Sequence, residues 1–351
     1  MYDIITFGSA TRDVFMIGKR FKVVESKKFI SRKGLCVPLG SKIHMQDIFF
    51  EMGGCGANAA VSFARQGFKV AYLGKVGEDA DGREIKEILK KNGVSLGLLM
   101  QSKKWHTSYS VIISIPQTER SILEYLGAAH HLYKNEIPWE KLNAKWFYIA
   151  PLSGPSWKLF EHLVDFAIKN KIKLAVNPGR SQLEKGLKKL ISCLDKIDIL
   201  LLNQEEAVKL TGLDFSQDKK CLEILRDKVK GIVVITKGPM GVIAGDKKYF
   251  YKAGIPKSGF KERTGAGDAF GSGFVSGILQ WSSEARGRSD RTLQLDAKLR
   301  FATPEAVKYA IQLGTANATS CIQKVGAVNG LLKKGEWGKW KKVKVTLSPA
   351  L

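Results

Sequence analysis

The stretch "KERTGAGDAFGSGF" (residues 261–274) sets four glycines around a single aspartate, Asp268, and runs straight into the apolar "VSGIL" (275–279). This pattern predicts a helix that begins just past a glycine turn, where the first backbone N–H groups are unpaired and the helix end is electropositive. Gly265 and Gly267 would then present consecutive N–H groups to an anion such as phosphate. Phosphoryl transfer needs such a cradle and one carboxylate that takes a proton from the attacking hydroxyl. Asp268 is placed to act as this carboxylate at the mouth of the cradle. The alternative is that Asp268 is a simple helix N-cap, a role that needs no flanking glycines.

A second glycine cluster, "EMGGCGANAAVSFARQG" (51–67), precedes a helix of small residues. Its G-x-G-x-x-A spacing from Gly54 satisfies a dinucleotide-binding fingerprint, but the cluster follows irregular β-like pieces and not the first strand-to-helix turn. Two other interpretations stand beside that one. In the first, the glycines simply let a helix pack closely. In the second, the bare backbone at Gly53 and Gly54 admits a polyhydroxyl ligand, whose hydroxyls bond Asn58 and Asp13, at the end of the first strand.

Strands and helices alternate from about residue 140, which predicts an α/β fold with a doubly wound, mostly parallel sheet flanked by helices. Helices are expected at 156–170, 181–195, 204–211 and 218–230, and "KVAYLGKVG" (69–77) reads as one strand. The β-rich pieces at about 14–50 and 106–128 break this alternation, and we expect them to form a small β-sheet lid over the main sheet. An exposed, arginine-rich insertion is expected at about 281–301. The whole chain, 1–351, is interpreted as a single domain.

Composition narrows the class of protein. The chain has 351 residues, 44% hydrophobic and 26% charged, as in globular proteins, with neither a long apolar run nor a signal-type N-terminus, so a cytoplasmic location is expected. Its five cysteines show no CxxC spacing, which argues against a disulfide framework or a zinc site. The net charge of +24 keeps nucleic-acid binding as a hypothesis. No zinc-finger, RNP-like or basic-heptad motif accompanies the lysine clusters at 18–34 and 333–345, so specific nucleic-acid binding is not expected.

Taken together, "GGCGANAAVSFARQG" and "RTGAGDAFGSGF" resemble the two signatures of the PfkB/ribokinase carbohydrate kinases, in the same order and at a similar separation. The resemblance covers nearly all of residues 1–332. Shorter features match as well: "VGEDADG" (76–82), "NQEE" (203–206) as an N-x-x-E motif, "TKGPMG" (236–241) and "IQKVGA" (322–327). It implies a ribokinase-like fold with a β lid, ATP as phosphoryl donor and Mg²⁺ as essential cofactor.

The resemblance also implies roles for individual residues. Asp268 would be the catalytic base, and the backbone of Gly265, Ala266 and Gly267 would form the anion hole for the moving phosphoryl group. The remaining residues divide between the acceptor, the nucleotide and the metal: Asp13, Gly53, Gly54 and Asn58 would hold the acceptor; Asn203, Thr236, Gly238 and Asn317 would line ATP; Asn203 and Glu206 would order Mg²⁺, largely through water.

The chain departs from the family pattern before the G-A-G-D core. Glu262 and Arg263 stand where many members carry Asp and Thr, in a region that touches a monovalent cation, so K⁺ activation is not a firm expectation. Arg263 would either aim its charge at the phosphates or lie on the surface. Cys55 replaces a position that is often polar in ribokinases.

The expected activity is phosphorylation of a primary hydroxyl of a small sugar by ATP. A nucleoside kinase of the same family and a non-catalytic sugar- or nucleotide-binding protein are the alternatives. The exposed edge strands of the lid could pair between two copies of the chain, so a homodimer is expected. No membrane partner is expected.

Overall fold

The computed structural model describes residues 1–18, 21–26, 32–114, 120–287 and 302–350. Its main body is a nine-stranded sheet in the order β17-β16-β15-β14-β13-β12-β11-β1-β6. The six strands from β14 to β6 run parallel, and β15, β16 and β17 continue the sheet in antiparallel pairings. The bounds of these strands are β1 Tyr2–Phe7, β6 Val70–Leu73, β11 Ala144–Ile149, β12 Lys173–Val176, β13 Ile199–Asn203, β14 Ile232–Thr236, β15 Val242–Gly245, β16 Tyr249–Ala253 and β17 Val345–Pro349.

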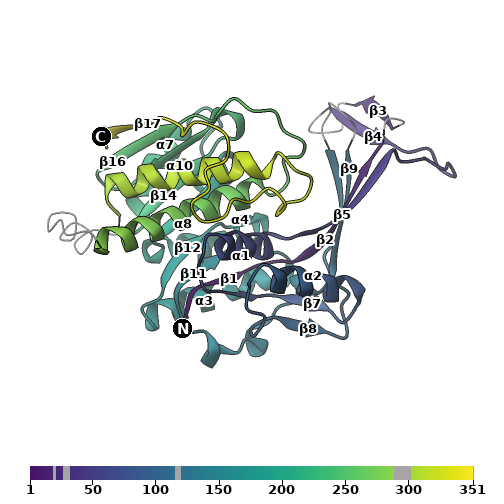
Figure 1. Ribbon diagram of the computed structural model, residues 1–351, viewed down its shortest axis with the longest axis horizontal. Coiled ribbons are helices and arrows are strands. Elements are labelled where there is room, and N and C mark those ends of the chain that lie inside the picture. The colour runs from purple at the N-terminus through teal and green to yellow at the C-terminus, as the bar shows by residue number, and fades with distance from the viewer. Residues whose placement is uncertain (19–20, 27–31, 115–119, 288–301, 351) are drawn as a thin grey trace.

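Helices cover both faces of this sheet, which explains why its central strands are continuous apolar runs such as "ILLL" and "IVVI". One face packs against α1 (Cys55–Arg65), α2 (Ala80–Lys91), α8 (Ala266–Gly287) and α10 (Pro304–Cys321). The other packs against α3 (Leu159–Lys169), α4 (Arg180–Glu184), α5 (Leu187–Ile191), α6 (Gln204–Thr211) and α7 (Asp218–Lys228). Figure 1 shows α8 and α10 lying side by side across the front of the sheet. The expected doubly wound α/β architecture is therefore confirmed.

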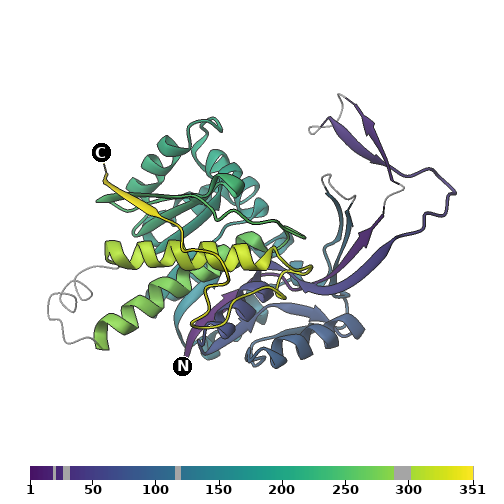
Figure 2. The same cartoon turned by 45° about the horizontal axis from the view of Figure 1, so that its top comes forward.

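A four-stranded sheet in the order β10-β9-β2-β5 projects from the body (Figure 2). It is built from β2 (Thr11–Ile17), β5 (Asp47–Gly53), β9 (Ser108–Ser114) and β10 (Arg120–Tyr125), and the hairpin β3 (Lys22–Glu25) and β4 (Lys33–Cys36) extends from it. These strands fall in the two segments that interrupt the alternation in the sequence. Arg12 of β2 ties the projecting sheet to the body, because its guanidinium donates to Glu84 on α2 at 2.7 Å. The short parallel pair of β7 (Lys75–Gly77) and β8 (Met100–Ser102) lies below it.

The structure corrects three expectations about individual elements. The strand expected at 69–77 is two strands in different sheets, separated by Gly74, where an added Cβ would lie 2.1 Å from the Tyr72 hydroxyl and only glycine fits. The helix expected at 181–195 is split into α4, α5 and a 3-10 turn, Leu194–Lys196; Gly186, a poor helix former, lies between α4 and α5 and packs against the Trp157 ring. The insertion expected at 281–301 begins as the last turns of α8, and its residues 288–301 lie outside the described residues.

The C-terminal segment also differs from expectation. The sequence showed there only a lysine cluster at 333–345, but β17 follows it and pairs with β16 along the edge of the main sheet. In the part of the chain that the structure describes, no helix is both long and apolar enough to cross a bilayer.

Candidate active site

The glycine loop before α8 forms as the sequence predicts. Gly265 has a φ of +80°, and its Cα packs so tightly on Ala327 that an added Cβ would lie 2.5 Å from the Ala327 Cβ. Gly267, two residues on and already helical, has nothing within 4 Å of an added Cβ. The loop therefore combines a fixed left-handed turn with open space in front of the first helical N–H groups, the arrangement that an anion cradle requires.

Asp268 is the third residue of α8, and its carboxylate is bound from the other glycine cluster. The Asn58 amide of α1 donates to Asp268 Oδ2 at 2.9 Å, across 210 residues of sequence. Burial raises the pKa of Asp268, the hydrogen bond from Asn58 and the nearby Cys55 thiol oppose that rise, and the charge of Asp13 adds to it. A side chain inside the first turn that bonds a residue of another helix is not acting as a helix N-cap.

The sequence placed Asp13 at the end of the first strand. In the structure it lies on the next strand, β2, which belongs to the projecting sheet. Thr11 Oγ1 donates to its Oδ1 at 2.8 Å. Burial raises the pKa of Asp13, and Thr11 and the nearby Ser110 of β9 oppose that rise. Gly53 lies directly against this carboxylate, because an added Cβ would fall 1.9 Å from Asp13 Oδ2. Asp13 therefore faces the first glycines of the α1 cluster, and it is close enough to Asp268 for the two charges to interact.

Asn58 is buried and carries an unused hydrogen-bonding atom. Its Nδ2 is engaged by Asp268, whereas its Oδ1 has no partner. A buried amide oxygen without a partner is costly to the fold, and a ligand hydroxyl placed there would satisfy it. The close-packing interpretation also holds for this cluster: Gly54 has a φ of +93°, and an added Cβ at Gly56 would lie 2.7 Å from Gly8 Cα.

Asn203 and Glu206 form a capping box at the start of α6. The Asn203 side chain accepts from Glu206 N at 2.8 Å, and Glu206 Oε2 accepts from Asn203 N at 2.8 Å. Burial raises the pKa of Glu206 to about 7, and the charges of Glu205 and Asp268 contribute to the rise. The N-x-x-E motif therefore has a local structural role, and it also sets a second carboxyl group within electrostatic range of Asp268.

Thr236 ends β14 directly beside Asn203, with which it pairs in the parallel register. Gly238 follows with a φ of +53° and open space around its Cα. Asn317 does not join this group. Its side chain is fully buried, its Nδ2 donates to Ala269 O and Ser62 Oγ, and its Oδ1 accepts from Leu332 N, so it holds α10 to α8 and offers no surface to a ligand.

The loop that precedes the anion cradle is internally bonded. Glu262 Oε1 accepts from Arg263 N, Thr264 N and Thr264 Oγ1 at 2.8 to 3.0 Å. The Arg263 guanidinium is exposed and lies 4.1 Å from the centre of the Phe260 ring, as a surface arginine does. Of the two interpretations of Arg263, the structure thus favours the surface one.

Two contributors to the site were not singled out from the sequence. Thr11 donates to Asp13, and Ser110 lies near enough to lower its pKa; only the spacing of Thr11, two residues away on the same strand face, indicated a contact. Cys55 was noted as an unusual residue in its motif, but nothing in the sequence tied its thiol to Asp268.

The donor set suits Mg²⁺ held mainly by phosphates and water. Among the residues that the structure describes, no group of three or more His, Cys, Asp or Glu is arranged to hold a metal ion. Glu206 has a hard carboxylate oxygen of the kind that Mg²⁺ prefers, and burial, with the charges of Glu205 and Asp268, raises its pKa. Such a residue would gain from a nearby divalent cation without enclosing it.

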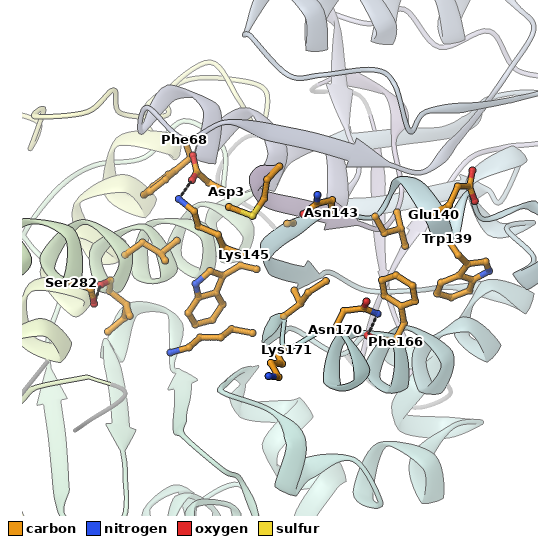
Figure 3. Close-up of a pocket in the computed structure, with 18 residues that line it drawn as sticks. Asp3, Phe68, Trp139, Glu140, Asn143, Lys145, Phe166, Asn170, Lys171 and Ser282 are labelled. Carbon is orange, nitrogen blue, oxygen red and sulfur yellow. Dashed lines mark hydrogen bonds and ion pairs between the residues drawn. The ribbon is translucent and has the colours of Figure 1, made fainter. Parts of the chain in front are cut away.

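A cavity of about 1040 Å³ lies at the other edge of the main sheet, where strands β1, β11 and β12 begin (Figure 3). Asp3, Lys145, Lys171 and the Trp139 ring line it. None of the predicted site residues does; Asn203 and Thr236 lie instead at the carboxyl ends of β13 and β14.

Comparison with known proteins identifies the family. Residues 28–334 match the sequence model of the pfkB family carbohydrate kinases. Ribokinase from Haemophilus influenzae is 30% identical over 257 residues, covering 70% of this chain and 79% of the relative. Fructokinase-1 from Oryza sativa subsp. japonica is 26% identical over 295 residues, covering 80% and 84%.

Solved structures share the fold. Ribokinase from Giardia lamblia superposes with a TM-score of 0.75 at 20% identity, covering 95% of this chain and 96% of that one. Adenosine kinase from Sinorhizobium meliloti superposes with a TM-score of 0.70 at 20% identity, covering 93% and 96%. At this level of identity the likeness establishes the ribokinase-like fold.

Proposed function

The chain belongs to the pfkB family of carbohydrate kinases, and from that premise we propose that it transfers the γ-phosphoryl group of ATP to a primary hydroxyl of a small sugar. One observation carries this proposal: the hydrogen bond between Asn58 and Asp268 brings the two glycine signatures together at one point. An acceptor held by the first signature would therefore lie beside a carboxylate at the mouth of the anion cradle.

In the proposed reaction, Asp268 accepts the proton of the acceptor hydroxyl as that oxygen attacks the γ-phosphorus in line. The N–H groups of Gly265, Ala266 and Gly267 bind the phosphoryl oxygens, on which negative charge is spread in the transition state. Burial raises the pKa of Asp268, which makes its carboxylate a stronger base than an exposed aspartate.

The acceptor site is built from groups suited to alcohols. Asp13 offers a carboxylate oxygen, Asn58 offers its unpartnered Oδ1, and both accept hydrogen bonds from hydroxyl donors. Gly53 and Gly54 leave the backbone bare, so a sugar ring could approach closely. Because these side-chain oxygens accept hydrogen bonds, they favour a polyhydroxyl compound, which donates them, over an anionic acceptor.

The nucleotide would lie along the ends of β13 and β14, against Thr236 and the open backbone of Gly238. Asn203 and Glu206 would order Mg²⁺ through bound water. When bound, Mg²⁺ neutralises charge on the ATP phosphates. The four-stranded sheet that carries Asp13 would act as a lid that excludes water, and its outer strands β5 and β10 offer edges through which two copies could pair.

The test is a coupled assay of ADP release with Mg²⁺, over ribose, fructose, ketodeoxygluconate, adenosine, cytidine and inosine, with and without K⁺. We expect turnover with at least one sugar. Turnover with nucleosides alone would assign the second acceptor class, because the ribose of a nucleoside also carries a primary hydroxyl. Binding of sugar or ATP without any ADP release would refute the kinase proposal and identify a binding protein.

A further inference from the structure

We propose that residues 333–344, which connect the kinase fold to the last strand, form a surface that binds the phosphate backbone of a nucleic acid without regard to base sequence. We call this segment the lysine strip. It contains none of the groups that would hold the sugar, ATP or Mg²⁺, so its role is separate from the proposed reaction.

The lysine strip concentrates positive charge on the surface. It holds one acid, Glu336, and six exposed lysines: Lys333, Lys334, Lys339, Lys341, Lys342 and Lys344. Glu336 is already engaged, since its Oε2 accepts from Lys333 N at 2.8 Å. Within the described part of the chain, none of the six ammonium groups forms an ion pair with a carboxylate. The strip therefore presents positive charge that the described protein does not neutralise.

The backbone of the lysine strip is fixed to the body of the protein. Lys334 N donates to Arg65 O at 2.9 Å, and the Gln312 amide of α10 donates to Val343 O at 3.0 Å. The strip then continues into β17, which pairs with β16. Figure 1 shows this segment in yellow, running from the end of α10 back across that helix to the sheet edge. The lysines are thus offered as an array, without the entropic cost of ordering a loose tail.

Two tryptophans hold lysines within this array. Lys342 Nζ lies 3.6 Å from the centre of the Trp337 ring, and Lys339 Nζ lies 5.7 Å from the centre of the Trp340 ring. The Trp337 ring packs edge to face on Tyr309 of α10, with ring centres 5.2 Å apart. An aromatic face attracts a cation, but unlike a carboxylate it does not cancel the charge. These lysines are therefore held in place and can still pair with phosphate.

The side chains of the strip favour a nucleic acid over an anionic membrane. A peripheral membrane site buries exposed apolar side chains at the headgroup boundary. Neither Trp337 nor Trp340 is among the exposed large hydrophobic side chains, and Lys342 already occupies a face of Trp337. A nucleic acid needs no such insertion, because the release of its condensed counterions drives binding to a row of lysines.

The mode of contact follows from the same side chains. Lysines bind phosphates, which carry no base sequence, and no base-reading motif accompanies them in this chain. The net charge of +24 would add long-range attraction for such a polyanion. Binding should therefore be independent of sequence and strongly dependent on salt.

The test is fluorescence anisotropy of a fluorescein-labelled oligo(dT) of about 20 nucleotides with the full chain, in about 50 to 200 mM KCl. If all six lysines contact phosphates, the logarithm of the association constant should fall with the logarithm of the KCl concentration with a slope of about −4. Replacing Lys339, Lys341, Lys342 and Lys344 by glutamine should reduce the slope to about −1.5 and weaken binding in about 50 mM KCl about tenfold or more. An oligonucleotide of mixed sequence should bind within about threefold of oligo(dT).

The matched control removes the same charge from the helices on the other face of the main sheet. Its four glutamine substitutions are at exposed lysines of the α4–α5–α7 side: Lys185, Lys188, Lys220 and Lys228. Its net charge equals that of the strip variant, but its slope should match wild type. If the strip variant fails to fold, as judged by thermal melting, Lys341→Gln with Lys344→Gln should still reduce the slope to about −3.

Three results would overturn the proposal. Equal weakening in the two fourfold variants would show that net charge alone drives binding, and a response that is flat with salt would exclude phosphate contacts. Binding to vesicles of phosphatidylcholine and phosphatidylserine, with none to either oligonucleotide, would assign the strip to a membrane surface. The kinase proposal fails separately, because ADP release by the strip variant should stay within about twofold of wild type, and a wild-type chain that releases no ADP can still be tested for binding.

Discussion

Replacing Glu206 by glutamine should stabilise the ligand-free protein at high pH. The change removes a charge but keeps an oxygen that can accept from Asn203 N, so the capping box of α6 survives. Burial and the nearby carboxylates raise the pKa of Glu206 from 4.5 to about 7 in the folded chain. Between these two values the folded protein holds more protons than the unfolded chain, and its free energy of unfolding therefore falls as pH rises.

The size of the effect follows from the same difference. A pKa raised by this much corresponds to about 3 kcal/mol of lost stability above pH 7. Because Glu206 is partly exposed, water screens the charge, and we expect about 1 to 2 kcal/mol. The free energies of unfolding of Glu206→Gln and wild type should thus be nearly equal at pH 5, and the variant should be the more stable by about 1 to 2 kcal/mol at pH 8.

The assay is urea unfolding at pH 5, 6, 7 and 8 in the presence of EDTA. Glu305→Gln is the matched control, since Glu305 is an exposed acid in the first turn of another helix, α10, and its difference from wild type should not grow from pH 5 to pH 8. A stability difference for Glu206→Gln that is constant across pH, or that grows toward acid, would refute the reasoning.

Four further outcomes are expected. Asp268→Asn should lower kcat by about a thousandfold, because a general base is lost, while the affinity for ATP measured by calorimetry stays within about threefold. Gly267→Ala should leave the melting temperature unchanged or higher, because its Cβ meets no atom, but it should lower kcat about tenfold or more by filling the anion cradle. In contrast, Gly265→Ala should lower the melting temperature, because Gly265 has a positive φ and the new Cβ would clash with Ala327. Gly53→Ala should raise the KM for the acceptor, since its Cβ would displace Asp13. Omitting K⁺ should change turnover less than about twofold, because the loop carboxylate of Glu262 is already bonded within its own turn.

Each of these outcomes has a clear opposite. Retained turnover in Asp268→Asn would contradict its role as base, and full activity in Gly267→Ala would place the phosphoryl group elsewhere. An unchanged acceptor KM in Gly53→Ala would remove Asp13 from the acceptor site. Strong K⁺ activation would show that the loop opens to bind a cation.

The parts of the fold that the sequence predicted are those that leave a local signal. The apolar runs of β13 and β14 predict buried parallel strands, because helices cover both of their faces. Breaks inside an apolar or helical pattern leave a weaker signal. Gly74 separates β6 from β7, which join different sheets, and Gly186 lies between α4 and α5 against the Trp157 ring, a contact that the sequence does not show.

The same distinction holds within the site. Glycine spacing located both loops, because only a bare backbone tolerates those turns and close approaches. It did not reveal that the Asn317 amide donates to the Ala269 carbonyl and to the Ser62 hydroxyl, because these pairs form only when α1, α8 and α10 pack together. Their partners lie far away in sequence, where periodicity and spacing carry no information.

The last strand has a practical consequence for anyone who shortens this chain. The family match ends at residue 334, and trimming to that boundary would delete β17 and leave the outer backbone groups of β16 unpaired. An uncovered strand edge recruits other strands, so we expect such a truncation to precipitate or self-associate even though every residue of the cleft is retained.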